Sequence, residues 1–169
     1  MKNIFSFFIF LIIIQYSFSQ NIQVPVTEYQ YMDRNEIMND NGEITISYDI
    51  KTDVPDGFYE IFYDSKKERP YMKGNVTNGS KEGKWEFYNE FSLIVRETVY
   101  NNGIKNGIEK VYDLDGNVID EIPYIDGNVE GSRKQYYSNG SVKSEMEISD
   151  GIVISMKTFD LSGNLIEKK

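Results

Sequence analysis

The residues whose spacing suggests chemistry in this 169-residue chain are carboxylates, and the sequence contains neither histidine nor cysteine. Catalysis through a histidine-activated nucleophile, zinc binding by imidazole or thiolate, and disulfide bonds are therefore excluded. Three glutamates recur every 24 residues, at Glu97, Glu121 and Glu145. Such a row could collect Ca²⁺, supply two carboxylates for glycoside hydrolysis, or form a solvated acidic face. Carboxylates two strands apart would be separated by about 10 Å, beyond the separations in glycosidases, which favours the acidic face.

A second acidic motif, Asp113-Leu-Asp-Gly-Asn117, is similar to the beginning of a calcium loop. The EF-hand loop needs glycine at its sixth position and a bidentate glutamate at its twelfth. Here glycine is fourth, and the same place in other parts of the chain reads as a plain turn. We therefore expect a structural turn at this motif, with no metal and no cofactor.

Aromatic side chains are the better candidates for binding. Tyr59, Trp85 and Phe87 have equivalent or neighbouring places in a repeat described below, and we expect them on one face of a sheet. Exposed aromatic residues beside an acidic rim suit a protein or glycan surface. The alternative is that a second layer, such as an N-terminal arm, covers them.

The N-terminus has the features of an export signal. Lys2 is the only charged residue before an apolar run over 4–14, which is too short to span a bilayer but fits the hydrophobic region of a signal peptide. We predict a signal peptide over 1–19, cleaved after Ser19, and export to the periplasm, the outer envelope or the medium. A retained membrane anchor is the alternative.

The elements that position these side chains follow from a repeat of 24 residues. Glycine recurs at this interval in three series: Gly83, Gly107 and Gly131; Gly79, Gly103, Gly127 and Gly151; Gly116 and Gly140. Two turn signals divide each unit into runs of about seven residues, which suit strands but not stable helices. The sequence predicts an all-β protein, an elongated single antiparallel meander sheet of about five β-hairpin repeats. The units are near 57–82, 83–106, 107–130, 131–153 and 154–169, in a repeat domain over 41–169.

The mid-unit loop sets the register of each hairpin. A three-residue loop ending in glycine pairs Tyr112 with Val118, and equivalent pairs are Tyr88 with Ile94, Tyr136 with Val142, and Phe159 with Leu165. This register also opposes unlike charges, namely Lys110 with Asp120, Glu86 with Arg96, and Lys157 with Glu167. A two-residue loop would oppose like charges, Glu86 with Glu97 and Lys157 with Lys168. Because like charges destabilise a cross-strand pair, we predict the three-residue loop.

Two faces follow from this register. The positions predicted to hold the fold are Gly83, Tyr88, Gly107, Tyr112, Gly116, Gly131, Tyr136, Gly140 and Phe159, with the aromatic ones in a single packing column. Trp85 and Phe87 are expected on the opposite face, beside the glutamate row. Residues 44–50 alternate with period two and predict a strand paired with residues 58–63. Residues 20–40 are polar and patternless, and we expect a loose lead-in arm there.

The unit, with glycine and tyrosine five residues apart, a mid-turn glycine, and then Tyr-x-x-Gly-x-x-x-Gly, resembles the MORN-repeat variant family. Bacterial members of this family are often labelled antitoxin-like, of the YwqK type, and the resemblance implies such a member. The pattern is carried by Gly83, Trp85, Tyr88, Tyr100, Gly103, Gly107, Tyr112, Gly116, Tyr124, Gly127, Gly131, Tyr136 and Gly140. The resemblance covers residues 57–169 and implies a module for protein binding or scaffolding. Two departures are that Trp85 is the sole tryptophan and that a signal peptide does not suit a cytoplasmic antitoxin.

These observations predict an exported, non-enzymatic protein-interaction module, of which an immunity or antitoxin-like protein is one form. The alternatives are a passive structural or scaffolding element of the cell envelope and, with less support, a carboxylate-dependent glycan hydrolase. We expect another protein as partner, with a glycan as the second option. Nucleic acid and membrane insertion after signal cleavage are not expected, since the net charge is −9 and the pI is near 4.6.

Overall fold

The computed structural model describes residues 21–25, 31–38 and 44–169, and these residues form strands and turns. The strands are β1 (Asn21–Pro25), β2 (Met32–Met38), β3 (Ile44–Ile50), β4 (Gly57–Phe62), β5 (Pro70–Thr77), β6 (Ser80–Tyr88), β7 (Ile94–Asn101), β8 (Ile104–Lys105), β9 (Gly107–Tyr112), β10 (Val118–Ile125), β11 (Asn128–Val129), β12 (Gly131–Tyr136), β13 (Val142–Ser149), β14 (Ile152–Phe159) and β15 (Leu165–Lys168). None of these residues belongs to a helix that could cross a membrane. The predicted signal peptide lies outside the described residues.

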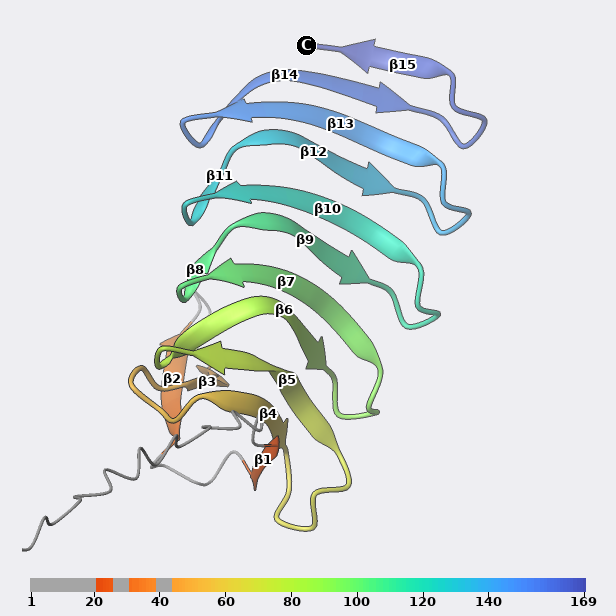
Figure 1. The fold of residues 1–169 in the computed structure, drawn as a ribbon. Coiled ribbons are helices and arrows are strands. Elements are labelled where there is room, and N and C mark those ends of the chain that lie inside the picture. Colours follow the sequence, from red (N-terminus) through yellow and green to blue (C-terminus); the bar gives the residue numbers. More distant parts are fainter. Residues whose placement is uncertain (1–20, 26–30, 39–43) are drawn as a thin grey trace, which may run out of the picture.

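Thirteen strands form one long sheet in the order β1-β4-β5-β6-β7-β9-β10-β12-β13-β14-β15, with β8 beside β7 and β11 beside β10. From β4 onward every neighbouring pair is antiparallel. Figure 1 shows the strands stacked one above another, with the mid-unit loops along one edge and the closing turns along the other. The predicted all-β meander of hairpin repeats is therefore confirmed.

Both kinds of turn have the predicted geometry. In the closing turns a residue with positive φ precedes glycine, as at Asn102 (φ 48°) and Gly103 (φ 80°), which is the backbone of a type I′ hairpin. In the mid-unit turn the Asp113 amide donates to the Asn117 carbonyl at 3.0 Å, and the Gly116 amide donates to the Asp113 carbonyl at 3.2 Å. Gly116 has a φ of 83°, so the loop has three residues and ends in a left-handed glycine.

The register prediction is correct next to the loops and wrong beyond them. Pairing of Tyr88 with Ile94, Tyr112 with Val118, Tyr136 with Val142 and Phe159 with Leu165 is confirmed. One extra residue then bulges from the second strand of each of these four hairpins, and the bulged residues are Val95, Ile119, Lys143 and Ile166. The bulge moves the remaining pairs by one position, so Glu86 faces Glu97 and Lys157 faces Lys168. The predicted pairs of Lys110 with Asp120, Glu86 with Arg96, and Lys157 with Glu167 are wrong.

The N-terminal part departs from the predicted meander. β3 confirms the strand predicted over 44–50, but it pairs with β2 in a separate two-stranded sheet and not with β4. β4 lies between β5 and the parallel strand β1. Where the structure describes the predicted loose lead-in arm over 20–40, the chain forms β1 and β2 instead. Ile22 is half-buried and Val24 and Met32 are buried, because these sparse apolar residues cover the start of the sheet.

The hydrophobic core lies where β1 and the β2–β3 sheet cover the first strands of the long sheet. Its buried members are Val24, Met32, Ile50, Val54, Tyr59, Ile61, Met72, Val76, Trp85, Phe87 and Tyr100. Figure 1 shows β2 and β3 beside the N-terminal end of the long sheet, away from β9–β15. Beyond β7 the buried side chains are few: Glu109, Pro123, Ser144 and Ile148. The sheet thus has a two-layered base and an extended single layer.

Candidate interaction surface

The aromatic residues expected to bind a partner lie inside the core. Tyr59 and Trp85 are completely buried, and Phe87 is 9% exposed. The expectation of an exposed aromatic patch is therefore wrong, and the alternative that an N-terminal layer covers these residues is correct. Met32 and Ile50 of the two-stranded sheet belong to the same buried cluster, which explains the burial.

Trp85 is fixed by contacts that its position in the repeat does not explain. The indole N–H donates to the carbonyl of Asn75 at 3.0 Å. The ring lies against Gly74 of β5, where a Cβ atom would overlap the indole. Gly74 is outside the 24-residue glycine series, so the sequence pattern gave no signal for it.

Lys81 connects the two-stranded sheet to the long one. Its side chain is almost fully buried and forms an ion pair with Asp49 of β3. The ammonium also lies 4.7 Å from the ring centre of Tyr100 and 5.3 Å from that of Trp85, in cation–π geometry. Burial lowers the pKa of Lys81, and the Asp49 carboxylate opposes that shift.

The glutamate row lies on the same face as the tyrosine column, not on the opposite face as predicted. The Tyr112 hydroxyl donates to Glu97 at 2.9 Å, and the Tyr136 hydroxyl donates to Glu121 at 2.7 Å. Because side chains alternate between faces, the single-residue bulges transfer each glutamate across the sheet. We call this side, with Tyr88, Tyr112, Tyr136 and the three glutamates, the tyrosine face, and the side with Trp85 the tryptophan face.

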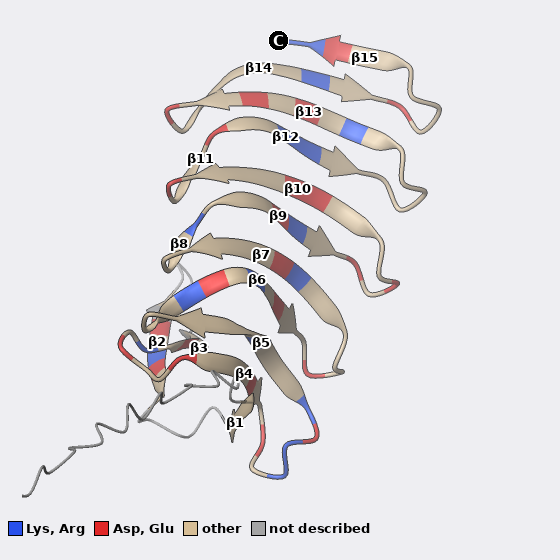
Figure 2. Cartoon of the chain, in the orientation of Figure 1, with Lys and Arg blue, Asp and Glu red and all other residues tan. Residues whose placement is uncertain are grey.

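Lysines alternate with the glutamates across the tyrosine face. Lys84 lies 2.9 Å from both Glu86 and Glu97, so it relieves the repulsion between these two directly opposed carboxylates. The ion pairs continue from Lys110 to Glu121 at 3.6 Å, and from Glu145 to Lys134 at 3.9 Å and to Lys157 at 3.2 Å. Figure 2 shows acidic and basic positions near the middle of successive strands. We call this row, Lys84, Glu97, Lys110, Glu121, Lys134, Glu145 and Lys157, the Lys–Glu ladder.

Hydrogen bonds and burial on the tyrosine face shift the pKa values of two tyrosines and of Glu86. Burial, together with the hydrogen bonds to Glu97 and Glu121, raises the pKa of Tyr112 and of Tyr136 to about 12. Burial alone would raise the pKa of Glu86, but hydrogen bonds from Tyr88, Lys73 and Lys84 outweigh it and bring the pKa to about 2. Glu86 is thus held as a hydrogen-bonded anion, a poor starting point for a general acid.

Grooves open on the tyrosine face between successive mid-unit loops. The first, of about 330 Å³, is lined by Ser92, Leu93, Ile94, Glu97, Tyr112, Asp113, Leu114, Asp115 and Gly116. The second, of about 310 Å³, is lined by Lys134, Val142, Glu145, Phe159 and Gly163. Ile94 and Val142, Glu97 and Glu145, Tyr112 and Phe159, and Gly116 and Gly163 are equivalent positions two repeats apart. We call these two sites the repeat grooves.

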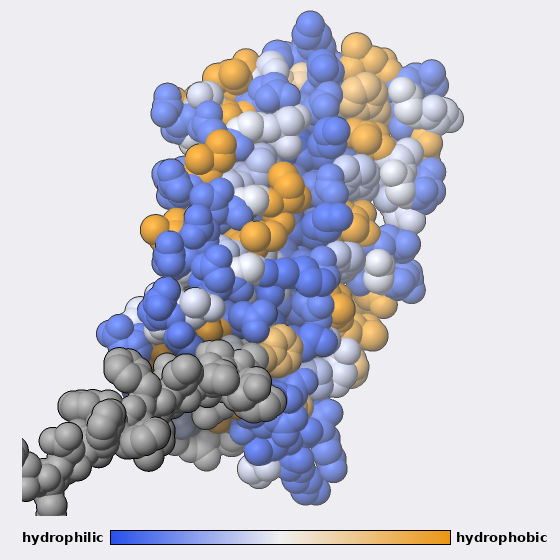
Figure 3. Space-filling model, viewed as in Figure 1, coloured by the Kyte–Doolittle hydropathy of each residue, from blue (hydrophilic) through white to orange (hydrophobic). Residues whose placement is uncertain are grey.

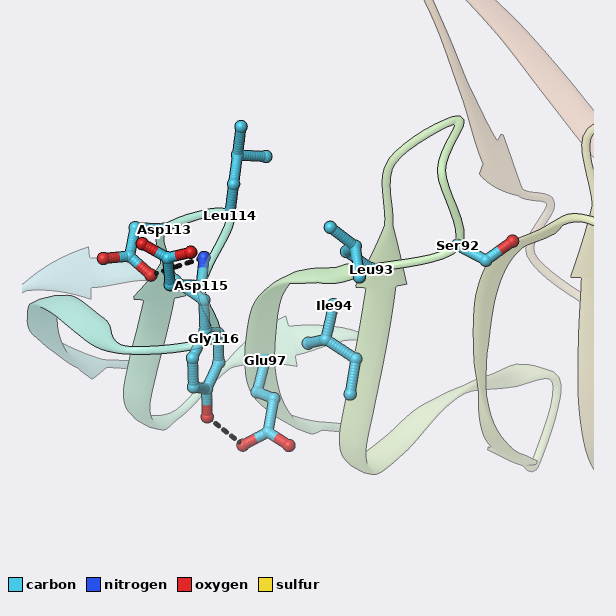
Figure 4. A pocket seen from close by; sticks show the side chains of 9 residues that line it. Ser92, Leu93, Ile94, Glu97, Asp113, Leu114, Asp115 and Gly116 are labelled. Carbon is cyan, nitrogen blue, oxygen red and sulfur yellow. Dashed lines mark hydrogen bonds between the residues drawn. The ribbon is translucent and has the colours of Figure 1, made fainter.

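Apolar side chains project beside the first repeat groove. Leu114 is 69% exposed at the loop tip, and Leu93 is 42% exposed on the neighbouring loop. Figure 4 shows Leu93 and Ile94 on one side, the Asp113–Gly116 loop on the other, and Glu97 beyond them. In Figure 3 hydrophobic residues form separate spots among hydrophilic ones, so the visible surface is not a continuous apolar sheet. The repeat thus forms a groove that has apolar side chains at its rim and charged side chains at its base.

The acidic loop is a hydrogen-bonded turn. One Asp113 carboxylate oxygen accepts the amides of Asp115 at 3.0 Å and Asn117 at 2.8 Å, and these bonds lower the pKa of Asp113. Asp160 accepts the equivalent bonds from Ser162 and Asn164. Within the described residues, no group of three or more acidic side chains could hold a metal ion.

The arrangement defines the chain as a β-hairpin repeat protein. Two of its segments, residues 105–126 and 129–150, match the model of the MORN repeat variant family. Each matched segment contains one mid-unit loop and ends at a closing turn. The predicted resemblance is confirmed for these two repeats and stays a prediction for the remainder. MORN repeats are generally modules for interaction with proteins or membranes, and theirs is not an enzyme family. The chain matches no curated protein.

Proposed function

We propose that the protein is an exported, non-enzymatic interaction module that binds another protein through the repeat grooves of its tyrosine face. The observation that carries the proposal is the recurrence of the same groove at equivalent positions of two repeats, with exposed leucines at the rim of the first. Exposed apolar side chains around a depression are typical of protein interaction sites. Together with Glu86, which pairs with Lys84, the Lys–Glu ladder at the base has as many carboxylates as lysines. It therefore adds polar contacts without a strong preference for either charge.

Export is the second part of the proposal. It is supported by the charged N-terminus and short apolar run over 4–14, which match a signal peptide. An immunity-like protein that binds a toxin outside the inner membrane and a scaffold of the envelope both agree with this location. Mass spectrometry of the protein from fractionated source cells tests it: an N-terminus at Gln20 in the exported fraction supports export, and an intact Met1 in the cytosol contradicts it.

The binding surface is tested by affinity capture from envelope extract of the source cells. The groove variant carries Leu93→Asp and Leu114→Asp, and the matched control carries Ile125→Asp and Ile152→Asp, two exposed residues at the opposite edge. A partner captured by the wild type and the control but lost by the groove variant supports the proposal. Equal capture by all three proteins contradicts the groove, and capture by none favours the passive structural element.

A further inference from the structure

We propose that a pocket on the tryptophan face binds a small carboxylic acid with an apolar body, through Arg96. The pocket has a volume of about 420 Å³ and lies where the two-layered base gives way to the single-layered repeats. Its lining residues are Tyr71, Phe87, Tyr88, Val95 and Val111, together with the charged Arg96 and Glu109. It is on the opposite side of the sheet from the repeat grooves, so the inference is independent of the function proposed above.

The Arg96 guanidinium is held in a fixed orientation, but its N–H groups are not all used in hydrogen bonds within the protein. It stacks on the ring of Phe87, 4.1 Å from the ring centre. Its buried Nε has no hydrogen-bond partner among the described residues, and the nearest acidic oxygen, Glu109 Oε2, is 4.0 Å away. The side chain is still 40% exposed. A planar cation held against an aromatic ring with unused donors is suited to bind an oxyanion.

Glu109 does not close on Arg96 because two other donors hold it. The Glu109 carboxylate is 5% exposed, and its Oε2 accepts from Thr98 Oγ1 at 2.7 Å and from Lys105 Nζ at 2.6 Å. Three donors therefore compete for one oxygen, and the Arg96 fork is the one left at a distance. The single Glu109 carboxylate thus lies between two cations, Lys105 in contact with it and Arg96 in the pocket.

The next repeat shows the same pair closed. The positions 24 residues on from Arg96 and Glu109 are Asp120 and Arg133, with the charges exchanged. There the guanidinium binds the carboxylate through two bonds, of 3.0 and 2.5 Å. The positions of Thr98 and Lys105 are occupied by Ile122 and Val129. The one further side-chain donor to Asp120 among the described residues, the Gln135 amide at 3.3 Å, does not displace the guanidinium. The open state of Arg96 is thus a property of this one repeat and not of the fold.

The chemistry of the pocket selects a monocarboxylate. The guanidinium fork matches the two oxygens of a carboxylate, and the valine and tyrosine walls suit an apolar body. A phosphate dianion would place two charges close to Glu109 in a protein of formal net charge −9, which disfavours it. The space is at the lower end of the range of ligand pockets, which favours a compact molecule.

The test uses 3-phenylpropanoate as the probe and its uncharged amide, 3-phenylpropanamide, as the matched ligand control. Each is titrated into the ¹⁵N-labelled purified protein, and amide shifts are followed by NMR. We expect saturable shifts for the acid centred on β7 and β9, and at least tenfold weaker binding of the amide. Inorganic phosphate, titrated separately, is expected to leave these amides unchanged at the same ionic strength.

Two variants locate the binding group. Arg96→Gln is expected to lower the affinity for the acid at least tenfold, whereas Arg133→Gln, the equivalent arginine of the next repeat, leaves it within twofold. Arg96→Lys keeps the positive charge but lacks the two parallel N–H donors of the guanidinium, so it is expected to give an intermediate affinity. This variant tests the proposal even if Arg96→Gln is poorly folded. The proposal is overturned by the absence of saturable binding to the wild type, by equal binding of the amide, or by stronger binding of phosphate. It is also overturned by unchanged affinity in a folded Arg96→Gln protein.

Discussion

At Gly74 the indole of Trp85 occupies the space that a side chain would need. The contact joins β5 to β6 inside the buried cluster, and the indole N–H is used by the Asn75 carbonyl one residue further along β5. A glycine in a strand interior usually weakens the strand, so it is commonly found where another group must pack closely against the backbone. The residue therefore serves packing and not a turn.

Gly74→Ala is expected to destabilise the protein by about 1–3 kcal/mol, because the added methyl overpacks the core. The measurement is the free energy of unfolding in urea, with Thr77→Ala, an exposed position of the same strand, as the control. In the double variant Gly74→Ala/Trp85→Phe the smaller ring removes part of the clash, so the cost should be less than the sum of the two single changes. Simple additivity would contradict the close contact.

The tyrosines bonded to the ladder predict a loss of stability in alkaline solution. Burial raises the pKa of Tyr112 and Tyr136 to about 12, whereas an unfolded tyrosine has a pKa of about 10. Their contribution is complete below pH 10 and is lost as the pH rises from about 10 to 12, since the unfolded chain releases these protons first. Urea unfolding at a series of pH values should show this decline. The double variant Tyr112→Phe/Tyr136→Phe should decline less steeply; an unchanged slope would show that these tyrosines do not contribute.

At the scale of the elements, the hairpins are predictable from sequence and their faces are not. Asx-Gly pairs specify both turns because glycine and asparagine tolerate positive φ, and residues adjacent to the loops pair as expected. The bulge at Ile119 has no comparable signal, because one extra residue in a strand changes neither composition nor spacing of the turns. The prediction that like charges are not directly opposed is wrong at Glu86 and Glu97, because Lys84, on the same face, forms ion pairs with both.

The same limitation applies to the two elements that cover the core. β3 alternates visibly, but β1 and β2 carry few apolar residues, and their contribution depends on Val24 and Met32. The choice of β2 as the partner of β3, and the parallel pairing of β1 with β4, depend on contacts distant in sequence. Local sequence patterns therefore predict the repeats but not the strands that cover the core. For the same reason they do not predict that Trp85 is buried.

The contact between the two sheets predicts opposite effects for two changes at one ion pair. Asp49→Asn leaves the buried Lys81 cation without its partner and is expected to cost about 1–2 kcal/mol, a value reduced because Asp49 is half exposed. Lys81→Met keeps the length of the side chain beside Trp85, Phe87 and Tyr100 and removes the buried charge. It is expected to be neutral or stabilising. Urea unfolding measures both, and a larger loss for Lys81→Met than for Asp49→Asn would refute the reasoning.

At the scale of the whole molecule, stability is expected to be uneven along the sheet. The two-layered base holds the buried cluster, whereas β14 is half exposed and all four residues of β15 are exposed. In a repeat array each unit contacts mainly its neighbours, so a unit without a second layer depends on one sheet surface and its turns. The chain has no disulfide to compensate, since it has no cysteine.

Native-state hydrogen exchange tests this gradient. Amides of β4–β7 are expected to exchange with the highest opening free energies, and those of β14 and β15 with the lowest, because local opening there exposes little apolar surface. Trp85→Phe should lower protection in β4–β7 and leave β14–β15 nearly unchanged, since nearest-neighbour coupling weakens over the intervening strands. Uniform protection along the sheet, or an equal loss at both ends in the Trp85 variant, would mean that the repeats and their base unfold as one cooperative unit. The repeat grooves would then be as rigid as the core, and a partner bound at the first groove, as proposed above, would protect the C-terminal strands as strongly as it protects β7.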